Sequence, residues 1–258
     1  MDKKESYLSI DKQLLRTWVY GEIDPEKTCI VLLHGGLDSL DTWKGFPEEL
    51  ALQTQLTVIA YERFGHGKSG RLTKHRESGY RHHEAEIVLP EVINAFGLKR
   101  VILVGHSDGA AISLMAAASL PETVVAVCAI APPLVPEKTV RDGIVEAIRE
   151  YENGGLANKL KKFHGEATDA LFYGWAKAWL SEQFDDWSCA KELQRISCPV
   201  ALVFGQADDY GYQPSLDKLL RHLKRKPEVL LLQGVGHMPH HHARKETIQA
   251  ALGLNKLA

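Results

Sequence analysis

The segment from Gly105 to Gly109, which reads Gly-His-Ser-Asp-Gly, has the residues needed to make a serine hydroxyl reactive. It follows the apolar run 101–104 and precedes an Ala-rich run, so we expect a strand to turn sharply into a helix at Ser107. Such a turn pushes the serine Oγ out of the backbone, and glycines two positions away on each side leave room for it. The plainer alternative is an ordinary helix N-cap. Because the flanking strand and small-residue helix are rare around chance matches, the context favours a serine nucleophile.

A serine nucleophile needs a base within hydrogen-bond reach. The chain has 12 histidines, and their positions relative to the predicted strands indicate which one can serve. His237 lies in a glycine-rich loop after the apolar run 229–232. That loop is expected at the carboxyl edge of a sheet, the edge that also carries Ser107. His106 adjoins the nucleophile and is expected to point away from it. We therefore predict His237 as the general base.

The base in turn needs a carboxylate that fixes its tautomer and stabilises the imidazolium. Two adjacent acids, Asp208 and Asp209, follow the apolar run 200–204 and Gly205. Adjacent side chains point in different directions, so at most one of them can serve. We predict Asp208 as the orienting acid and keep Asp209 in reserve, with capping of the following turn as its alternative role.

Two backbone amides are candidates for binding the negative charge that develops on the substrate oxygen. The apolar run 30–33 opens into His-Gly-Gly-Leu, where the glycine pair can turn an amide toward the serine. We predict Gly36 as the first donor, with Leu37 as the less favoured substitute. The amide of Asp108, directly after the nucleophile, is the predicted second donor. The alternative for the glycine pair is a plain turn that leaves the strand.

Apolar runs and helical patterns alternate along most of the chain, which indicates a parallel sheet between helix layers. Strands are expected at residues 14–20, 28–33, 56–61, 100–104, 124–130, 199–204 and 229–232. Helices are expected at residues 79–96, 110–120, 214–225 and 245–252. Residues 136–196 contain no credible strand and are expected to form three or four short helices, broken at 153–155 and 164–165.

This helical segment is expected to be a lid over the site. We predict a core of residues 1–133 and 197–258 and a helical cap of residues 134–196. Phe172, Trp175 and Trp179 share one face of a lid helix. With Leu37, they are the candidate substrate-binding residues. The alternatives are that these aromatic residues only fix the lid to the core, or that the segment makes no substrate contact.

Composition excludes several classes of function. The net charge of the 258 residues is −2, with no long basic run, so nucleic acid or an anionic membrane surface is not an expected partner. The start lacks the apolar stretch of a signal peptide, and no run is long enough for a membrane span. Four scattered cysteines suit a reduced, cytoplasmic protein. The histidines at 237 and 240–242 cannot all converge on one ion, so no metal or cofactor is expected.

Taken in order, these segments resemble the α/β-hydrolase superfamily. The glycine pair after His34 is similar to its oxyanion motif, and residues 61–69 resemble its D-R-x-G-x-G-x-S turn, with Glu62 and Phe64 departing from the usual residues. The chain order Ser, Asp, His is also that of the family. The resemblance implies a mostly parallel eight-stranded sheet flanked by helices, with a helical lid inserted after the sixth strand.

The Gly-His-Ser-Asp-Gly segment is similar to that of small esterases, including biphenyl-hydrolase-like amino-acid-ester hydrolases. The resemblance implies hydrolysis of a small carboxylic ester through an acyl-enzyme. In those relatives the acid after the nucleophile helps to hold a substrate ammonium; the alternative for Asp108 is to brace the helix N-terminus. A carbon–carbon bond hydrolase or lyase on the same triad, or a ligand-binding receptor with low turnover, remains open. The sequence gives no indication of the oligomeric state.

Overall fold

Eight strands form one sheet in the order β1-β2-β4-β3-β5-β6-β7-β8 in a computed structural model that describes residues 2–72, 76–185 and 187–255. Only β2 runs antiparallel to its neighbours, and the remaining pairs are parallel. The strands are β1 (Lys3–Ile10), β2 (Gln13–Tyr20), β3 (Cys29–Leu33), β4 (Val58–Tyr61), β5 (Val101–His106), β6 (Val124–Ile130), β7 (Val200–Gly205) and β8 (Glu228–Leu232).

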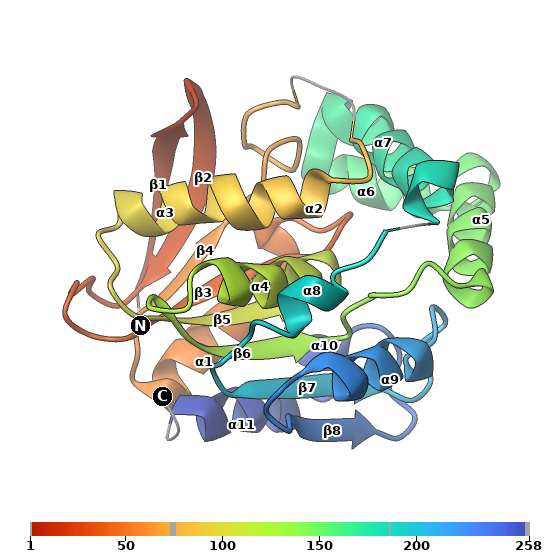
Figure 1. Ribbon diagram of the computed structural model, residues 1–258. Coiled ribbons are helices and arrows are strands. Elements are labelled where there is room, and N and C mark those ends of the chain that lie inside the picture. The colour runs from red at the N-terminus through yellow and green to blue at the C-terminus, as the bar shows by residue number, and fades with distance from the viewer. Residues whose placement is uncertain (1, 73–75, 186, 256–258) are drawn as a thin grey trace.

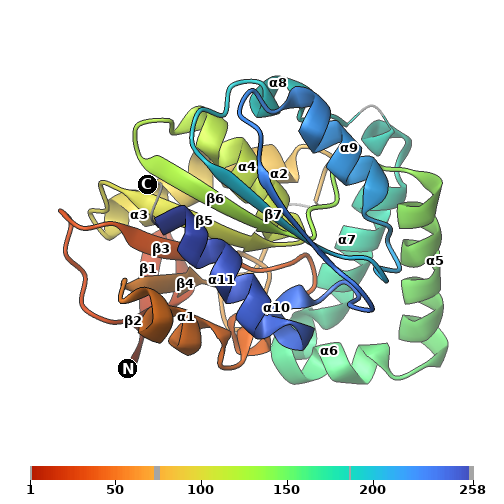
Figure 2. The same ribbon diagram turned by 90° about the horizontal axis from the view of Figure 1, so that it is seen from below.

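Helices cover both faces of the sheet, which is why its central strands are apolar at consecutive positions. Along β3, Ile30 and Leu32 pack into the core beneath α1 (Phe46–Thr54) and α11 (Arg244–Asn255). Val31 and Leu33 pack into the core beneath α3 (Leu89–Ala95) and α4 (Asp108–Ser119). Figure 2 shows α1, α10 and α11 across one face. The helices of the core are α1 (Phe46–Thr54), α2 (Tyr80–His83), α3 (Leu89–Ala95), α4 (Asp108–Ser119), α8 (Ala190–Leu193), α9 (Gln213–His222), α10 (Pro239–His242) and α11 (Arg244–Asn255).

Shorter helical elements complete the fold. The π-helical turn η2 (Glu84–Val88) joins α2 to α3, so that one continuous helix matches the pattern predicted for residues 79–96. The short 3-10 turns are η1 (Leu40–Trp43), η3 (Gly165–Ala167) and η4 (Glu182–Phe184).

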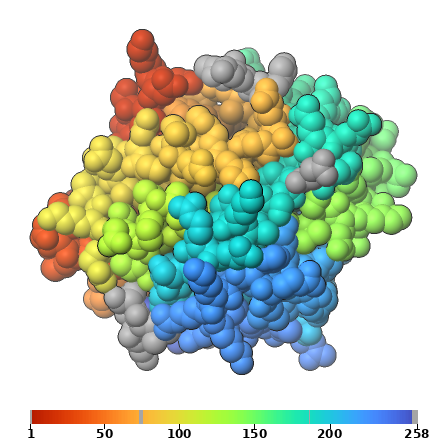
Figure 3. Space-filling model, viewed as in Figure 1, coloured from red at the N-terminus to blue at the C-terminus, as the bar shows by residue number. Residues whose placement is uncertain are grey.

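The helical lid is inserted between β6 and β7, as the sequence and the resemblance predict, and consists of α5 (Lys138–Asn153), α6 (Leu156–His164) and α7 (Thr168–Leu180). The predicted breaks are confirmed, since α5 ends before Gly154 and α6 ends before Gly165. Figure 1 shows the three helices beyond the carboxyl edge of the sheet, and Figure 3 shows them packed against the rest of the surface. Helix α8 packs against α4 and α9 and so belongs to the helical layer over the sheet, although it lies within the predicted cap.

One strand was not predicted. Strand β1 pairs with β2 along its whole length but leaves most of its side chains exposed, so it has no apolar run. Asp11 and Lys12, both with positive φ, form the turn between the two strands. This strand completes the eight that the resemblance implied. In the described residues, no helix is both long enough and apolar enough to cross a membrane.

Candidate active site

Ser107 lies at the turn from β5 into α4, with a φ of 53° and a ψ of −118°. This backbone conformation is unfavourable for a residue with a side chain and is typical of functional sites. A Cβ on Gly105 would lie 2.3 Å from the carbonyl oxygen of Gly109. A Cβ on Gly109 would lie 2.1 Å from the carbonyl oxygen of Leu33. Both positions therefore require glycine, because the atoms that a Cβ would contact belong to the backbone and cannot move aside as the end of a flexible side chain could.

The structure brings the predicted nucleophile, base and acid together at the carboxyl edge of the sheet. His237 Nε2 lies 3.0 Å from Ser107 Oγ, and His237 Nδ1 lies 2.7 Å from Asp208 Oδ2. The buried carboxylate accepts the Nδ1 proton, which leaves Nε2 free to accept the proton of the serine hydroxyl. The other oxygen of Asp208 accepts a hydrogen bond from the Tyr210 amide at 2.9 Å. Asp208 thus caps the turn that was assigned to Asp209, and Asp209 instead lines an open groove beside α5.

Gly36 and Asp108, the predicted amide donors, line the same cavity as Ser107. The Asp108 amide belongs to the first turn of α4, where no helical carbonyl is available to accept its hydrogen. The N-terminal end of this helix also carries partial positive charge, which favours a developing oxyanion.

The Asp108 carboxylate is held by buried partners. Its Oδ1 accepts from Arg81 Nε at 3.0 Å, with a second Arg81 nitrogen also bonded to it, and its Oδ2 accepts from the Tyr80 hydroxyl at 2.7 Å. Burial would raise the pKa of Asp108, but the charges of Arg81 and Arg63 and the hydrogen bond from Tyr80 together outweigh it and lower this pKa to about 2. Because both oxygens already have strong donors, the carboxylate is poorly placed to take up a substrate ammonium.

His106 makes no hydrogen bond to Ser107 in the described part of the chain; it lines the cavity, and its ring joins two loops. His106 Nε2 bonds to the carbonyl oxygen of His237 at 2.9 Å, and Nδ1 lies 3.0 Å from Asp38 Oδ2. Asp38 Oδ2 also accepts from the Gly35 amide at 3.1 Å. Burial opposes ionisation of Asp38, but its hydrogen bond with His106 and the neighbouring imidazoles together hold its pKa well below the usual range. The loop of the oxyanion donor and the loop of the base are therefore connected through one imidazole.

The lid is tied to the oxyanion loop by His164, at the end of α6. His164 Nε2 donates to the carbonyl oxygen of Leu37 at 3.0 Å, and Nδ1 accepts from the Gly67 amide at 2.9 Å. Burial lowers the pKa of His164, which favours the neutral ring that this pair of bonds requires.

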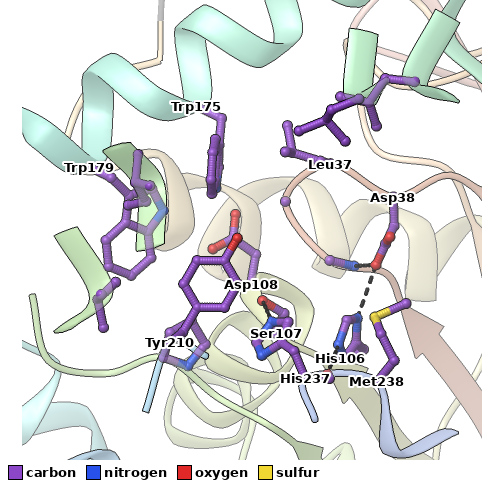
Figure 4. A pocket seen from close by; sticks show the side chains of 17 residues that line it. Leu37, Asp38, His106, Ser107, Asp108, Trp175, Trp179, Tyr210, His237 and Met238 are labelled. Atoms are coloured by element: carbon purple, nitrogen blue, oxygen red, sulfur yellow. Dashed lines mark hydrogen bonds and ion pairs between the residues drawn. The ribbon is translucent and has the colours of Figure 1, made fainter. Parts of the chain in front are cut away.

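A cavity of about 300 Å³ lies between the triad and the lid. In Figure 4, Trp175 and Trp179 reach from α7 into this cavity, and Tyr210 stands beside Ser107. Leu37 lines it from the core side. Its lid wall is apolar and consists of Val140, Ile144, Leu156, Leu160, Trp175 and Trp179.

Phe172 is not part of the cavity wall, although it was predicted with the two tryptophans. It is fully buried and stacks on Tyr151 of α5, with the ring centroids 3.8 Å apart. Seven residues separate it from Trp179, or about 10 Å along a helix. Phe172 therefore lies where α7 packs on α5 and fixes the lid helices to one another.

A family model described as "Alpha/beta hydrolase family" matches residues 30–250. The chain belongs to this family. The described part of this α/β hydrolase contains no group of three or more His, Cys, Asp or Glu side chains placed to hold a metal ion.

Solved structures of other α/β hydrolases share the fold. An enzyme from a Medee basin deep-sea metagenome library is 18% identical, with a TM-score of 0.79 over 98% of both chains. The carboxylesterase CesB of Bacillus subtilis is 20% identical, with a TM-score of 0.73 over 99% of this chain and 92% of that one. The 2-hydroxy-6-oxo-6-phenylhexa-2,4-dienoate hydrolase of a Rhodococcus species is 19% identical, with a TM-score of 0.77 over 99% of each.

Among curated proteins, an uncharacterized protein of Mycobacterium tuberculosis is 30% identical over 96 residues, or 37% of this chain. The match spans only 26%, about a quarter, of that relative's length. An uncharacterized protein of Mycobacterium bovis matches to the same extent.

Asp38, Tyr210 and Arg81 are among the residues at the site of this α/β hydrolase that were not predicted. Asp38 lies four positions after His34, and Tyr210 lies two positions after Asp208, so both follow motifs that the sequence does reveal. Arg81 lies 27 positions before its partner Asp108, in a polar helical pattern, and has no local signal.

Proposed function

We propose that this α/β hydrolase cleaves a small carboxylic ester through an acyl-enzyme on Ser107. The observation that carries the proposal is the unbroken chain of hydrogen bonds from Ser107 Oγ through His237 to Asp208, at 3.0 and 2.7 Å, beside a cavity. A serine aligned in this way loses its proton to the imidazole as its oxygen attacks a carbonyl.

In the first half of the reaction, Ser107 Oγ forms a bond to the ester carbonyl carbon while His237 takes the hydroxyl proton. The amides of Gly36 and Asp108 stabilise the oxyanion. The bond to the alcohol oxygen then breaks, and His237 returns the proton to the leaving alcohol. In the second half, water attacks the acyl carbon while His237 takes its proton; the bond to Ser107 Oγ then breaks, His237 returns the proton to Oγ, and the acid leaves.

The cavity favours a neutral ester over the substrate of a carbon–carbon bond hydrolase. The name of the Rhodococcus enzyme describes a dienoate, which carries a carboxylate. Among the described residues that line this cavity there is no lysine or arginine, whereas Asp38 and Asp108 are both present. The carboxylate of such a dienoate would therefore have no cationic partner in the cavity wall.

We further propose a cytoplasmic location and a small-molecule ester as the partner. All four cysteines are free thiols, as suits a reducing compartment. The overall charge of −2 does not favour nucleic acid or an anionic membrane surface.

Labelling with a fluorophosphonate, which reacts with activated serines, tests the function directly. We expect one label per wild-type chain, none in Ser107→Ala, and hydrolysis of 4-nitrophenyl butyrate that falls by about 10⁶-fold in the same variant. Ser119→Ala is the matched control, because Ser119 bonds only to carbonyls of its own helix. A wild-type protein that neither labels nor turns over any ester would refute the proposal and favour a receptor of the same fold.

A further inference from the structure

Three neutral hydrogen-bond donors in the cavity wall have no hydrogen-bond partner in the part of the chain that the structure describes. Trp175, Trp179 and Tyr210 line the cavity. The indole N–H of Trp179 is buried and has no hydrogen-bond partner among the described residues. Trp175 is 7% exposed, and neither its indole N–H nor the hydroxyl of Tyr210 is hydrogen-bonded to a described residue. Buried polar groups are nearly always paired in proteins, and an unpaired one is unfavourable. These donors therefore point to a ligand that supplies the acceptor.

The indole of Trp175 lies against the loop that carries the predicted oxyanion donor. A Cβ built on Gly36 would lie 2.8 Å from Trp175 Nε1 and 2.9 Å from Asp108 Oδ2. The absence of a side chain at Gly36 is what allows the indole to approach. An oxygen bonded to Trp175 Nε1 would consequently lie only a few bonds from a carbonyl held at Ser107.

The chemistry of the wall also defines what this acceptor is. An indole N–H can only donate, so it selects an oxygen acceptor on the ligand. No lysine or arginine is among the described residues that line this cavity, so its wall offers no cation to a carboxylate. The acceptor is therefore a neutral oxygen, as in an ether, a ketone or a second ester.

We propose that the site is selective for neutral esters with a second oxygen acceptor within a few bonds of the scissile carbonyl, bound by Trp175 Nε1 with Trp179 and Tyr210 beside it. This inference rests on the proposed ester hydrolysis. Trp43 and Trp187 also have buried, unpaired indole N–H groups, but neither lines the cavity. Replacing one of them therefore tests whether the effect on selectivity requires an unpaired indole in the cavity wall or follows from the loss of any unpaired indole.

Two pairs of esters of equal size test the proposal. The acyl pair is 4-nitrophenyl methoxyacetate and 4-nitrophenyl butyrate, and the alcohol pair is 2-methoxyethyl acetate and n-butyl acetate. In each pair an ether oxygen replaces one methylene. The measured quantity is the ratio of kcat/KM for the oxygen compound to that for its partner. Differences in intrinsic reactivity cancel when this ratio is compared between the wild type and a variant.

In Trp175→Phe, we expect the ratio to fall by about three- to tenfold in at least one pair, the effect of one hydrogen bond to a neutral group. Tyr210→Phe, which removes only an oxygen atom, is the second variant, and a fall of the same size is expected. Trp187→Phe is the matched control and should leave both ratios unchanged.

The outcomes are distinct. If both ratios change by less than threefold in Trp175→Phe and in Tyr210→Phe, while butyrate hydrolysis and fluorophosphonate labelling persist, the selectivity inference is wrong and the proposed function stands. A fall of equal size in Trp187→Phe would also overturn the inference. If the wild type hydrolyses none of the four esters and takes no label, the proposed function fails and the inference fails with it.

Discussion

Replacing Arg81 with Met should lower the free energy of unfolding by about 4 kcal/mol, because the buried Asp108 carboxylate loses its closest charged partner and keeps only the more distant Arg63, at 4.0 Å. Both side chains are almost completely inaccessible, at 0% and 2% exposure. Opposite charges about 3 Å apart attract by about 5 kcal/mol at an effective dielectric constant of 20. Arg81 also lies over the rings of Trp179 and Trp187, at 4.4 and 4.9 Å from their centroids, and these contacts would be lost as well.

The decisive comparison is the double variant Arg81→Met/Asp108→Asn, measured with both single variants by urea unfolding at pH 7. Asp108→Asn removes the carboxylate charge that Arg81 no longer compensates, so the double variant should be more stable than Arg81→Met alone. Arg149→Met is the control, since Arg149 forms an exposed ion pair with Glu146 and should change stability by less than about 1 kcal/mol. If the two single losses simply add in the double variant, the reasoning from the buried pair is wrong.

The same pair predicts a dependence of stability on pH. The pKa of Asp108 is lowered to about 2, below its ordinary value of 3.8, so the folded state favours the ionised form. This contribution, about 2 kcal/mol, is complete above pH 5 and is lost as the pH falls toward 2. The free energy of unfolding of Asp108→Asn should therefore fall less steeply than that of the wild type over this range. Parallel curves would contradict the assignment.

Three further substitutions test the site. Asp208→Asn should lower kcat by about 10⁴-fold at neutral pH without unfolding the protein, because the imidazole loses its orienting acceptor. Asp209→Asn is the matched control and should retain kcat within about twofold. Equal losses in the two variants would show that the two acids do not differ in role. Gly36→Ala should lower kcat/KM by at least about tenfold. The new Cβ would lie only 2.8 Å from Trp175 Nε1, so the indole and the loop that carries residue 36 would both have to move. Unchanged ester hydrolysis would show that close contact between the indole and this loop is not needed. His164→Phe removes the two hydrogen bonds that join His164 of α6 to Leu37 and Gly67, and should speed amide hydrogen exchange in α6 by about tenfold. Unaltered exchange would mean that packing alone holds the lid.

Local motifs were sufficient to find the residues at the ends of the strands. Ser107, Asp208 and His237 each follow an apolar run, and the carboxyl ends of parallel strands meet at one edge. Topology therefore brings together residues that are 29 to 130 positions apart. The breaks between lid helices were equally accessible, since they depend on glycines within the segment itself.

Features that depend on packing between distant elements could not be derived in this way. The pairing of Arg81 with Asp108 requires the position of α2 over α4, which no local pattern encodes. Phe172 shares a helix face with Trp179, yet the first packs within the lid and the second lines the cavity, because position along the helix decides the neighbour. Strand β1 is held by a hairpin rather than by burial, so the alternation of apolar residues does not reveal it.

The imidazole of His106 has a consequence for exchanging segments between relatives. Because it contacts both Asp38 and the backbone of His237, the two loops beside the nucleophile cannot be replaced one at a time. A transplanted base loop would need a backbone carbonyl within hydrogen-bond distance of His106 Nε2. A transplanted oxyanion loop would need a carboxylate within hydrogen-bond distance of His106 Nδ1. Chimaeras of this fold should therefore retain function only when both loops and the residue before the serine come from a single parent.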